Sequence, residues 1–352
     1  MNFKKITIAC IATALSLVSC TNDDNESKSQ GTYDKGVIIL NEGGFTKGNA
    51  EISFLANAGV ATENKLFALN NGGSLLGDVA QNFNANGATA YVVMNGSNKI
   101  EVLERYSLKR IATISKDLYN PRYIVFANGK GYVTNWGDGD DATDDYVAVI
   151  NLTTNLVESK IPVAEGPEKL IVYNSKLYVA HKGGYGSGNT LSVIDVATAK
   201  VSTTVPVGDV PAAIEENQGV IYVLCQGKSV WSGAESAGKI QKINPATNLV
   251  TTSLDFALTS HPGKMDIENN KIYFTQAKNV YVMNTSDTSL PTTALFESTF
   301  SPYGFAVNNN LIYTGDAGDY SSDGKIAIYD TAGSLKSTYA VGIIPGGFFF
   351  NN

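Results

Sequence analysis

The sequence is poor in the residues on which most enzymes, nucleic-acid binders and helical proteins depend. The 352-residue chain has 3 Cys, 2 His and 2 Trp, only 17% of its residues are charged, and 26 Lys and Arg stand against 33 Asp and Glu. A formal net charge of −7 leaves no excess of cations to neutralise phosphates, which excludes nucleic acid as a partner. Helical bundles and coiled coils contain more charged residues, so the low charge also argues against a helical fold.

What the chain has in quantity favours β-structure. It contains 34 Gly, 18 Tyr and 14 Phe, and 43% of its residues are hydrophobic. Glycine and aromatic residues suit tight turns and strands, and this length and apolar content allow a sizeable core. We therefore expect an ordered, all-β protein.

The first twenty residues predict an export signal. Lys4 and Lys5 precede a mostly apolar stretch over 6–18, which is short for a membrane span and typical of a signal peptide. The four residues LVSC that end at Cys20 resemble a bacterial lipobox, which implies cleavage before Cys20 and lipidation of its thiol. An ordinary signal peptide with an incidental Cys is the alternative. Because no later hydrophobic run is long enough to span a bilayer, we expect a lipid anchor.

The residues after Cys20 predict a lipidated flexible tether over 20–35, following a signal peptide over 1–19. The tether is polar and lacks hydrophobic periodicity. Its acidic start, with Asp23 and Asp24, resembles the export signal that sends lipoproteins to the cell surface in some Gram-negative bacteria. The predicted location is therefore the outer membrane, with the protein lipid-anchored and exposed at the cell surface.

The cysteines indicate that the mature protein has no disulfide framework. Cys10 leaves with the signal peptide and Cys20 carries lipid, so only Cys225 remains. Cys225 ends an apolar strand pattern, which favours a buried, inert thiol over a nucleophile.

A repeat runs through the chain, and it predicts the fold. Each unit has a Pro, an apolar strand, an Asn- or Gly-rich turn and a second strand with a Tyr eleven residues after the Pro. The pairs are Pro121 with Tyr132, Pro167 with Tyr178, Pro211 with Tyr222, Pro262 with Tyr273, and Pro302 with Tyr313. A sixth copy keeps the spacing without the Pro, from Ala80 to Tyr91. Self-similarity at a period of roughly 40 to 50 residues indicates a repeat architecture.

Each unit continues into two more strands, as in 146–157 and 191–201, and four strands in such a period make a propeller blade. The last unit stops after one strand, Pro345–Phe350, and Gly36–Gly43 supplies a second near the N-terminus. Pairing these terminal strands closes the ring and protects both edges. We predict a seven-bladed β-propeller of four-stranded blades over 36–352.

The second strand of one repeat carries a family signature. Tyr132-Val133-Thr134-Asn135 is the YVTN motif, and the strands at Tyr178, Tyr222 and Tyr273 hold degenerate copies. The chain thus resembles the YVTN family of β-propeller repeats. The resemblance implies a fold and leaves function open, since propellers host binding, scaffolding and catalysis alike.

One face of the predicted ring carries the candidate binding residues. The loops between the second and third strands of several blades are long, glycine-rich and aromatic, and such loops carry function on rigid scaffolds. The predicted ligand-binding residues are Phe45, Trp136, His181, Tyr185, Trp231, His261, Tyr320 and Arg122. Exposed aromatics beside Asn, Gln and Gly suit a large, partly apolar ligand held by stacking and hydrogen bonds. The alternative is that the aromatic residues are plugs packed between blades.

Metal and catalytic sites have weaker support. Asp138, Asp140, Asp141, Asp144 and Asp145 form an acidic loop, but the calcium-loop spacing and its bidentate Glu are absent, which favours a solvated loop. The sequence holds no HExxH, GxSxG, P-loop or paired-Cys motif, so we predict no metal, no catalytic residue and no cofactor.

The combination of lipoprotein signal and propeller resembles a family of surface lipoproteins that capture cobalamin and pass it to a TonB-dependent outer-membrane transporter. The stretches that carry this resemblance are Gly36–Gly43, Leu76–Gln81, Lys99–Val102 and Asn120–Ile124. The resemblance implies a non-enzymatic protein that binds cobalamin or a related corrinoid as a transported ligand, with the transporter as partner. A surface adhesion or protein-interaction platform is the second hypothesis. A propeller lyase or lactonase, with His181 or His261 beside a carboxylate at the axis, is the third.

Overall fold

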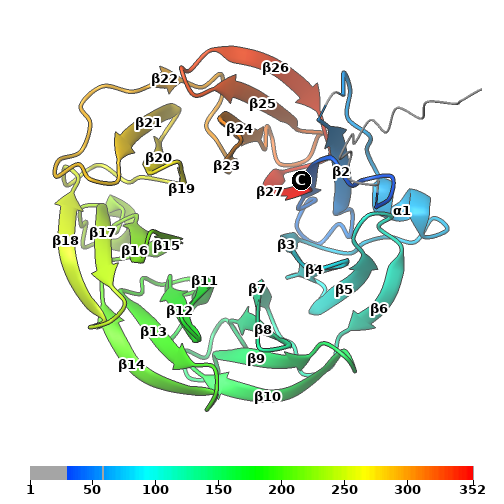
Figure 1. Cartoon of the computed structure of the whole chain (residues 1–352), viewed down its shortest axis with the longest axis horizontal. Coiled ribbons are helices and arrows are strands. Elements are labelled where there is room, and N and C mark those ends of the chain that lie inside the picture. Colours follow the sequence, from blue (N-terminus) through cyan, green and yellow to red (C-terminus); the bar gives the residue numbers. More distant parts are fainter. Residues whose placement is uncertain (1–29, 58, 352) are drawn as a thin grey trace, which may run out of the picture.

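The computed structural model describes residues 30–57 and 59–351, which form a ring of seven blades around a central axis (Figure 1). This confirms the predicted all-β, seven-bladed β-propeller. The predicted signal peptide, most of the predicted tether and Cys20 lie outside the described residues. No helix within 30–57 and 59–351 has the length and apolar character needed to cross a membrane.

Blades 1 to 3 follow one another along the chain, and each is an antiparallel sheet whose strands run in order from the axis outward. Blade 1 consists of β3 (Ala80–Asn86), β4 (Thr89–Met94), β5 (Lys99–Glu104) and β6 (Arg110–Ile114). Blade 2 consists of β7 (Pro121–Ala127), β8 (Lys130–Asn135), β9 (Tyr146–Asn151) and β10 (Leu156–Pro162). Blade 3 consists of β11 (Pro167–Tyr173), β12 (Lys176–His181), β13 (Thr190–Asp195) and β14 (Lys200–Pro206).

Blades 4 to 6 repeat this order. Blade 4 consists of β15 (Pro211–Asn217), β16 (Val220–Cys225), β17 (Lys239–Asn244) and β18 (Leu249–Asp255). Blade 5 consists of β19 (Met265–Glu268), β20 (Lys271–Gln276), β21 (Asn279–Asn284) and the two-residue β22 (Phe296–Glu297). Blade 6 consists of β23 (Gly304–Asn308), β24 (Leu311–Asp316), β25 (Lys325–Asp330) and β26 (Leu335–Ala340).

Blade 7 joins the two ends of the chain, as predicted. The C-terminal strand β27 (Pro345–Asn351) lies innermost and pairs antiparallel with β1 (Gly36–Asn41), which pairs with β2 (Glu51–Ala56). Figure 1 shows the red β27 beside the blue strands. In the described part of the chain this sheet has three strands rather than the four expected. A single bridge between Phe54 and Glu63 stands at the outer edge, and the short helix α1 (Leu66–Asn70) follows it.

The repeated Tyr packs between blades. Tyr132 is 1% exposed and Tyr178 is fully buried, and the equivalent Tyr of the other repeats are also buried. One cluster joins Tyr91 of blade 1 to Ile124 and Val133 of blade 2, and comparable clusters join other neighbouring blades. Burial on both sheet faces therefore explains why these strands are apolar at nearly every position.

The turns between first and second strands are tight. Asn128 and Gly129 have φ of 48° and 73°, and Asn269 and Asn270 have φ of 50° and 60°. Two consecutive residues with positive φ match the right-handed twist of a two-residue hairpin, and Asn and Gly adopt that conformation readily. These turns leave little room for a site on their face of the ring.

The opposite face, which we call the loop face, carries the loops between second and third strands together with the connections between blades. The longer loops cover residues 42–50, 136–145, 182–189, 226–238 and 317–324. Blades 1 and 5 have short loops, at 95–98 and 277–278. The loop face therefore has long loops on five blades and short loops on blades 1 and 5.

Cys225 is the inert thiol that the sequence predicts. It ends β16, is fully buried, and its Sγ lies 3.8 Å from Oε1 of Gln241. Burial raises the pKa of the thiol to about 12, so it stays protonated and poorly nucleophilic at neutral pH.

Candidate functional site

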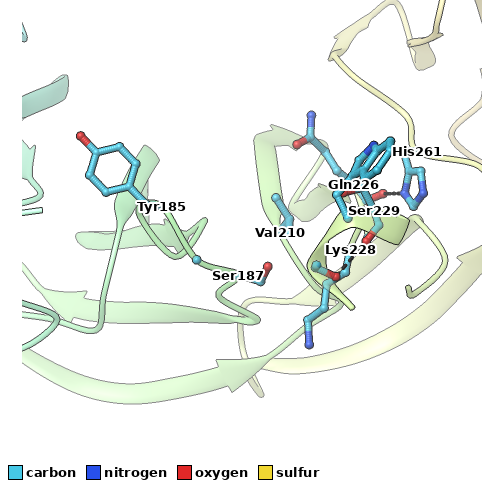
Figure 2. Close-up of a pocket in the computed structure, with 11 residues that line it drawn as sticks. Tyr185, Ser187, Val210, Gln226, Lys228, Ser229 and His261 are labelled. Carbon is cyan, nitrogen blue, oxygen red and sulfur yellow. Dashed lines mark hydrogen bonds between the residues drawn. The ribbon is translucent and has the colours of Figure 1, made fainter. Parts of the chain in front are cut away.

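A cavity of about 700 Å³ opens on the loop face between blades 3 and 4, and we call it the rim pocket (Figure 2). Its volume falls within the usual range for pockets that hold small molecules. It brings together three predicted site residues, Tyr185, Trp231 and His261. Figure 2 shows Tyr185 on one side and His261 with Gln226 on the other.

The two large aromatic side chains of the rim pocket point away from the protein core. Trp231 is 93% exposed and Tyr185 is 81% exposed. Trp231 lies in a short 3-10 turn, Val230–Ser232, which Gly233 terminates with a φ of 76°. No folding requirement accounts for this exposure, since Trp is usually well buried. Side chains presented in this way are available to stack on a ligand.

Close backbone contacts hold the loops of the rim pocket. The Lys182 amide donates to the carbonyl of Gly166 at 2.9 Å, and a Cβ on Gly166 would lie 1.8 Å from the Gly184 nitrogen. In the neighbouring loop, the Ser236 hydroxyl donates to Asp209 at 2.7 Å and accepts from the Lys228 amide at 2.9 Å. These contacts preorganise the loops, which limits the ordering cost of binding.

His261 is fixed at the edge of the rim pocket. Its Nδ1 lies 3.0 Å from the carbonyl oxygen of Gln226, and its Nε2 lies 3.3 Å from Oε1 of Glu235. These contacts engage both ring nitrogens, one with a backbone carbonyl and one with a side-chain carboxylate. The orientation of His261 is therefore set by its neighbours.

His181 does not reach the rim pocket or the axis. It is the last residue of β12, is 1% exposed, and its Nε2 lies 2.8 Å from Oγ of Ser192. Burial lowers the pKa of His181 to about 4, so the ring is neutral at physiological pH. The structure thus separates the two histidines that the sequence places on one face.

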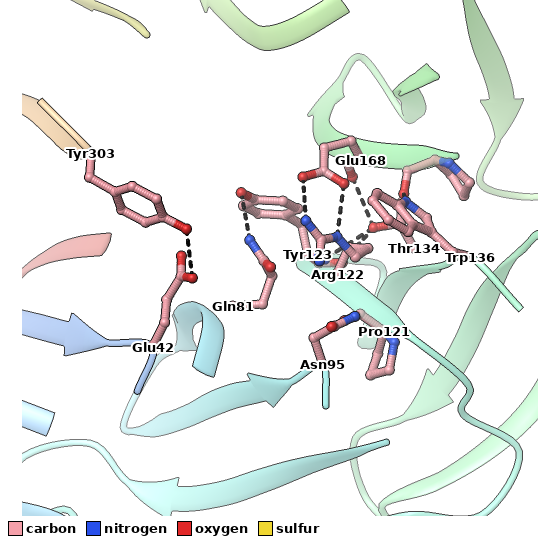
Figure 3. Close-up of polar contacts among 11 residues, drawn as sticks. Glu42, Gln81, Asn95, Pro121, Arg122, Tyr123, Thr134, Trp136, Glu168 and Tyr303 are labelled. Carbon is pink, nitrogen blue, oxygen red and sulfur yellow. Dashed lines mark hydrogen bonds and ion pairs between the residues drawn. The ribbon is translucent and has the colours of Figure 1, made fainter. Parts of the chain in front are cut away.

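Trp136 and Arg122 form a tight group between blades 2 and 3 (Figure 3). Arg122 donates to both carboxylate oxygens of Glu168, at 2.9 and 2.8 Å, and its guanidinium lies 4.2 Å from the centre of the Trp136 ring. The Trp136 indole N–H donates to the Pro167 carbonyl at 3.1 Å. Burial opposes ionisation of Glu168, but Arg122 outweighs it and lowers the pKa of the carboxyl. These contacts match the predicted alternative in which Trp136 is a plug.

This group touches the rim pocket through Tyr185. The rings of Trp136 and Tyr185 meet edge to face, with centres 5.9 Å apart. Trp136 therefore supports one wall of the rim pocket from behind, and Arg122 supports Trp136.

Phe45 and Tyr320 lie in another part of the loop face. Phe45 is 74% exposed in loop 42–50, and Tyr320 is 57% exposed in loop 317–324. Tyr320 meets Tyr303 edge to face at 5.9 Å, and neither Phe45 nor Tyr320 lines the rim pocket. The predicted aromatic residues thus form two separate groups.

Apart from Arg122, the polar residues around the axis were not predicted from the sequence. The Tyr303 hydroxyl donates to Glu42 at 2.8 Å, and the Gln81 amide donates to the Tyr123 hydroxyl at 3.1 Å (Figure 3). Burial raises the pKa of Glu42. A signal for such residues exists, because Arg122, Glu168 and Tyr303 each follow the repeated Pro directly. The position after the repeated Pro marks the inner wall of the ring but is not polar in every blade, since Ala212 and Gly263 occupy it in blades 4 and 5.

The acidic loop binds its own backbone. The Asp144 carboxylate accepts from the Asp138 amide at 2.9 Å, and Asp141 accepts from the amide and hydroxyl of Thr143 at 2.9 and 2.6 Å. Across residues 30–57 and 59–351, no group of three or more His, Cys, Asp or Glu side chains is arranged to hold a metal ion.

Solved structures share the fold of this chain at low sequence identity. A quinonprotein alcohol dehydrogenase-like protein from Bacteroides thetaiotaomicron is 16% identical, with 92% of this chain and 80% of that chain covered and a TM-score of 0.69. A functionally unknown protein from Desulfotomaculum acetoxidans is 11% identical, with 90% and 98% covered and a TM-score of 0.65. Hydrazine synthase from Kuenenia stuttgartiensis is 15% identical, with 74% and 86% covered and a TM-score of 0.60. These identities support the fold alone.

Comparison with curated proteins finds no match. A family model described as a domain of unknown function, DUF5074, matches residues 35–351. That range contains all seven blades, and the protein therefore belongs to the DUF5074 family.

Proposed function

We propose that this protein is a non-enzymatic surface lipoprotein that captures a large, partly apolar small molecule, cobalamin or a related corrinoid, for delivery to a TonB-dependent outer-membrane transporter. The observation that carries the proposal is the rim pocket, in which Tyr185 and Trp231 stand exposed beside a fixed His261. The lipid anchor at Cys20 and the location at the cell surface are part of the proposal and rest on the sequence.

The chemistry of the rim pocket suits such a ligand. Tyr185 and Trp231 offer apolar faces for stacking, while Gln226, Ser187 and Ser229 offer amide and hydroxyl groups that bond to polar side groups. Loops already held by hydrogen bonds lose little entropy when a ligand arrives.

The same geometry favours binding over turnover. An acid–base mechanism at the axis would use His181 or His261 there, but His181 is buried against Ser192 and His261 bonds to Gln226 and Glu235 on the rim. Neither ring stands free to exchange a proton with a substrate at the axis.

Isothermal titration of the purified full chain with cyanocobalamin tests the proposal. We expect saturable heat and colour retained on the protein. Trp231→Ala should weaken binding at least about tenfold, because a central aromatic anchor carries much of the energy of an interface. Leu249→Ala, at a 64% exposed position on the outer strand β18, is the matched control and should bind normally. No heat and no retained colour would overturn the proposal.

A second candidate function is a protein-docking platform, and the exposure of Phe45 and Tyr320 favours it. These side chains lie away from the rim pocket on the loop face, where a transporter could dock. Co-purification of a membrane protein that Phe45→Ala abolishes, with no bound small molecule, would support this function instead.

A further inference from the structure

The axis of the ring is a second cavity, of about 720 Å³, which we call the axial channel. Three lysines line it: Lys169 in β11, Lys182 just after β12, and Lys264 just before β19. In the described part of the chain, none of the three ammonium groups forms an ion pair with a carboxylate. Three such cations facing one cavity are unusual in a protein of net charge −7.

The wall between these lysines is recessed. Blade 4 separates blades 3 and 5, and its inner strand carries Ala212 and Ala213 where blade 3 carries Glu168 and Lys169. Ala212 is half-buried and lines the channel with a small side chain, whereas Ala213 is 1% exposed and packs in the core between blades 4 and 5. We call this part of the channel the lysine recess, defined by Lys169, Lys182, Lys264 and Ala212.

Gln226 stands between the lysine recess and the rim pocket. It lines both cavities, and its amide nitrogen donates to the Gly263 carbonyl at 3.1 Å. This contact ties the loop of blade 4 to the segment that holds Lys264. The two cavities are neighbours, and the axial channel is the one lined by three lysines.

Among the described residues, carboxylates lie near the lysines without forming an ion pair with them: Glu42 and Glu168 act to raise the pKa of Lys264, and Lys169 acts to lower the pKa of Glu215 and of Asp266. Arg122 already pairs with Glu168. Burial raises the pKa of Glu42, and burial together with Asp266 raises the pKa of Glu215 to about 7, so both carboxyls resist ionisation. Asp266 is bonded to two backbone amides, at 2.7 Å each.

Lys264 shows the effect of this crowding. Burial, with Lys169 and Lys182 adding like charge, lowers the pKa of Lys264 to about 8, although Glu42 and Glu168 oppose the shift. The ammonium form still predominates at neutral pH, in an environment that disfavours it. An incoming anion would relieve this by restoring favourable electrostatics at all three lysines.

We propose that the lysine recess is a binding site for a small, multiply charged anion that bears carboxylate or phosphate groups. Lys169 and Lys182 contact the anion from blade 3 and Lys264 contacts it from blade 5, while the small side chain of Ala212 leaves the volume that the anion fills. The site does not depend on the proposed corrinoid site.

Titration of the full chain with citrate and with pyrophosphate, at low and at physiological salt, tests the site. We expect at least one of the two to bind, with affinity that falls as salt rises. Lys264→Gln and Lys169→Gln should each weaken binding at least about tenfold. Lys200→Gln, at an exposed position on the outer strand β14, is the matched control and should bind normally.

A second variant tests the volume without changing charge. Ala212→Leu should abolish anion binding while the thermal unfolding midpoint shows that the ring is intact. Binding of both anions to Lys264→Gln at wild-type affinity, or binding of neither anion to the wild type at low salt, would overturn the site. Cyanocobalamin titrated into the same variants separates the two proposals: Trp231→Ala loses the corrinoid and keeps the anion, and Lys264→Gln does the reverse.

Discussion

The rim pocket and the axial channel are neighbours at Gln226, yet they differ in how their side chains are held. The rim pocket lies among loops, and the Tyr185 and Trp231 side chains that line it are 81% and 93% exposed. The axial channel is lined by the inner strands, where polar side chains bond across blades, as Gln81 does with Tyr123 and as Arg122, beside the channel, does with Glu168.

This difference indicates which residues can be substituted without loss of stability. A solvent-exposed side chain makes few contacts that stabilise the fold. Substitutions of the exposed residues of the rim pocket should therefore change the free energy of unfolding little. A charge buried against its partner on the next blade contributes to folding and to the site together, so its loss has consequences for both.

The largest effect should come from breaking the pair on the inner wall. Arg122→Ala leaves the carboxylate of Glu168, which is 5% exposed, without its cation. We expect a loss of about 3–5 kcal/mol in the free energy of unfolding, measured with urea at pH 7. The deficit should shrink as pH falls, because burial without Arg122 raises the pKa of the Glu168 carboxyl and favours its protonated form.

Lys130→Ala provides the contrast to Arg122→Ala, because it breaks the exposed pair between Lys130 and Glu158. It should change the stability little. If both variants lost the same free energy of unfolding, burial would not make the Arg122–Glu168 pair more important for stability than an exposed pair.

A smaller effect should follow from acidification through His181, which lies behind the loop of the rim pocket. The folded protein holds the pKa of His181 at about 4, below its ordinary value of 6.5. The stabilisation is therefore complete above pH 6.5 and is lost as pH falls toward 4, by about 3 kcal/mol in total. Urea unfolding between pH 7 and pH 4 measures it, and His181→Gln should remove this part of the pH dependence. An unchanged slope in the variant would contradict the assignment.

The smallest effect on stability should come from the rim pocket itself. Trp231→Ala removes a side chain that is 93% exposed, so we expect the free energy of unfolding to stay within about 0.5 kcal/mol of wild type. Thermal and urea unfolding measure this. A larger loss would show that Trp231 packs against the ring and is a structural plug.

The sequence allows the ring itself to be predicted, because the fold repeats and the sequence repeats with it. The spacing from Pro121 to Tyr132 marks the first hairpin of a blade, and its recurrence gives the number of blades. The closing strand follows from Pro345, which begins a unit that the N-terminus completes. Within the described residues blade 7 has no fourth strand, which could not be foreseen by analogy because the sequence after Ala56 departs from the repeat.

The candidate site was less predictable, for two physical reasons. The burial of His181 could not be predicted because β12 is buried on both faces. Its sequence therefore lacks the alternation of polar and apolar residues that would show which way each side chain points. The contacts on the inner wall could not be predicted because they join residues of neighbouring blades. Arg122 and Glu168 are 46 residues apart in the sequence, and whether they meet depends on the radius of the whole ring. The rim pocket was accessible because its aromatic residues lie in loops whose composition differs from that of the strands.

The pairing of β27 with β1 has a consequence for the timing of assembly. The contacts between Gly36 and Asn351 join residues at opposite ends of the described chain. Forming them carries a large entropic cost, because a long segment of the chain must be closed into a loop. Asn351 also bonds to Tyr33 and to Arg105, which locks the last strand against the first blade. Gly346 and Phe348 of that strand line the axial channel. The channel wall is therefore complete only when β27 has paired with β1. A molecule that binds at the axis would distinguish the closed ring from a ring in which this pairing has not formed.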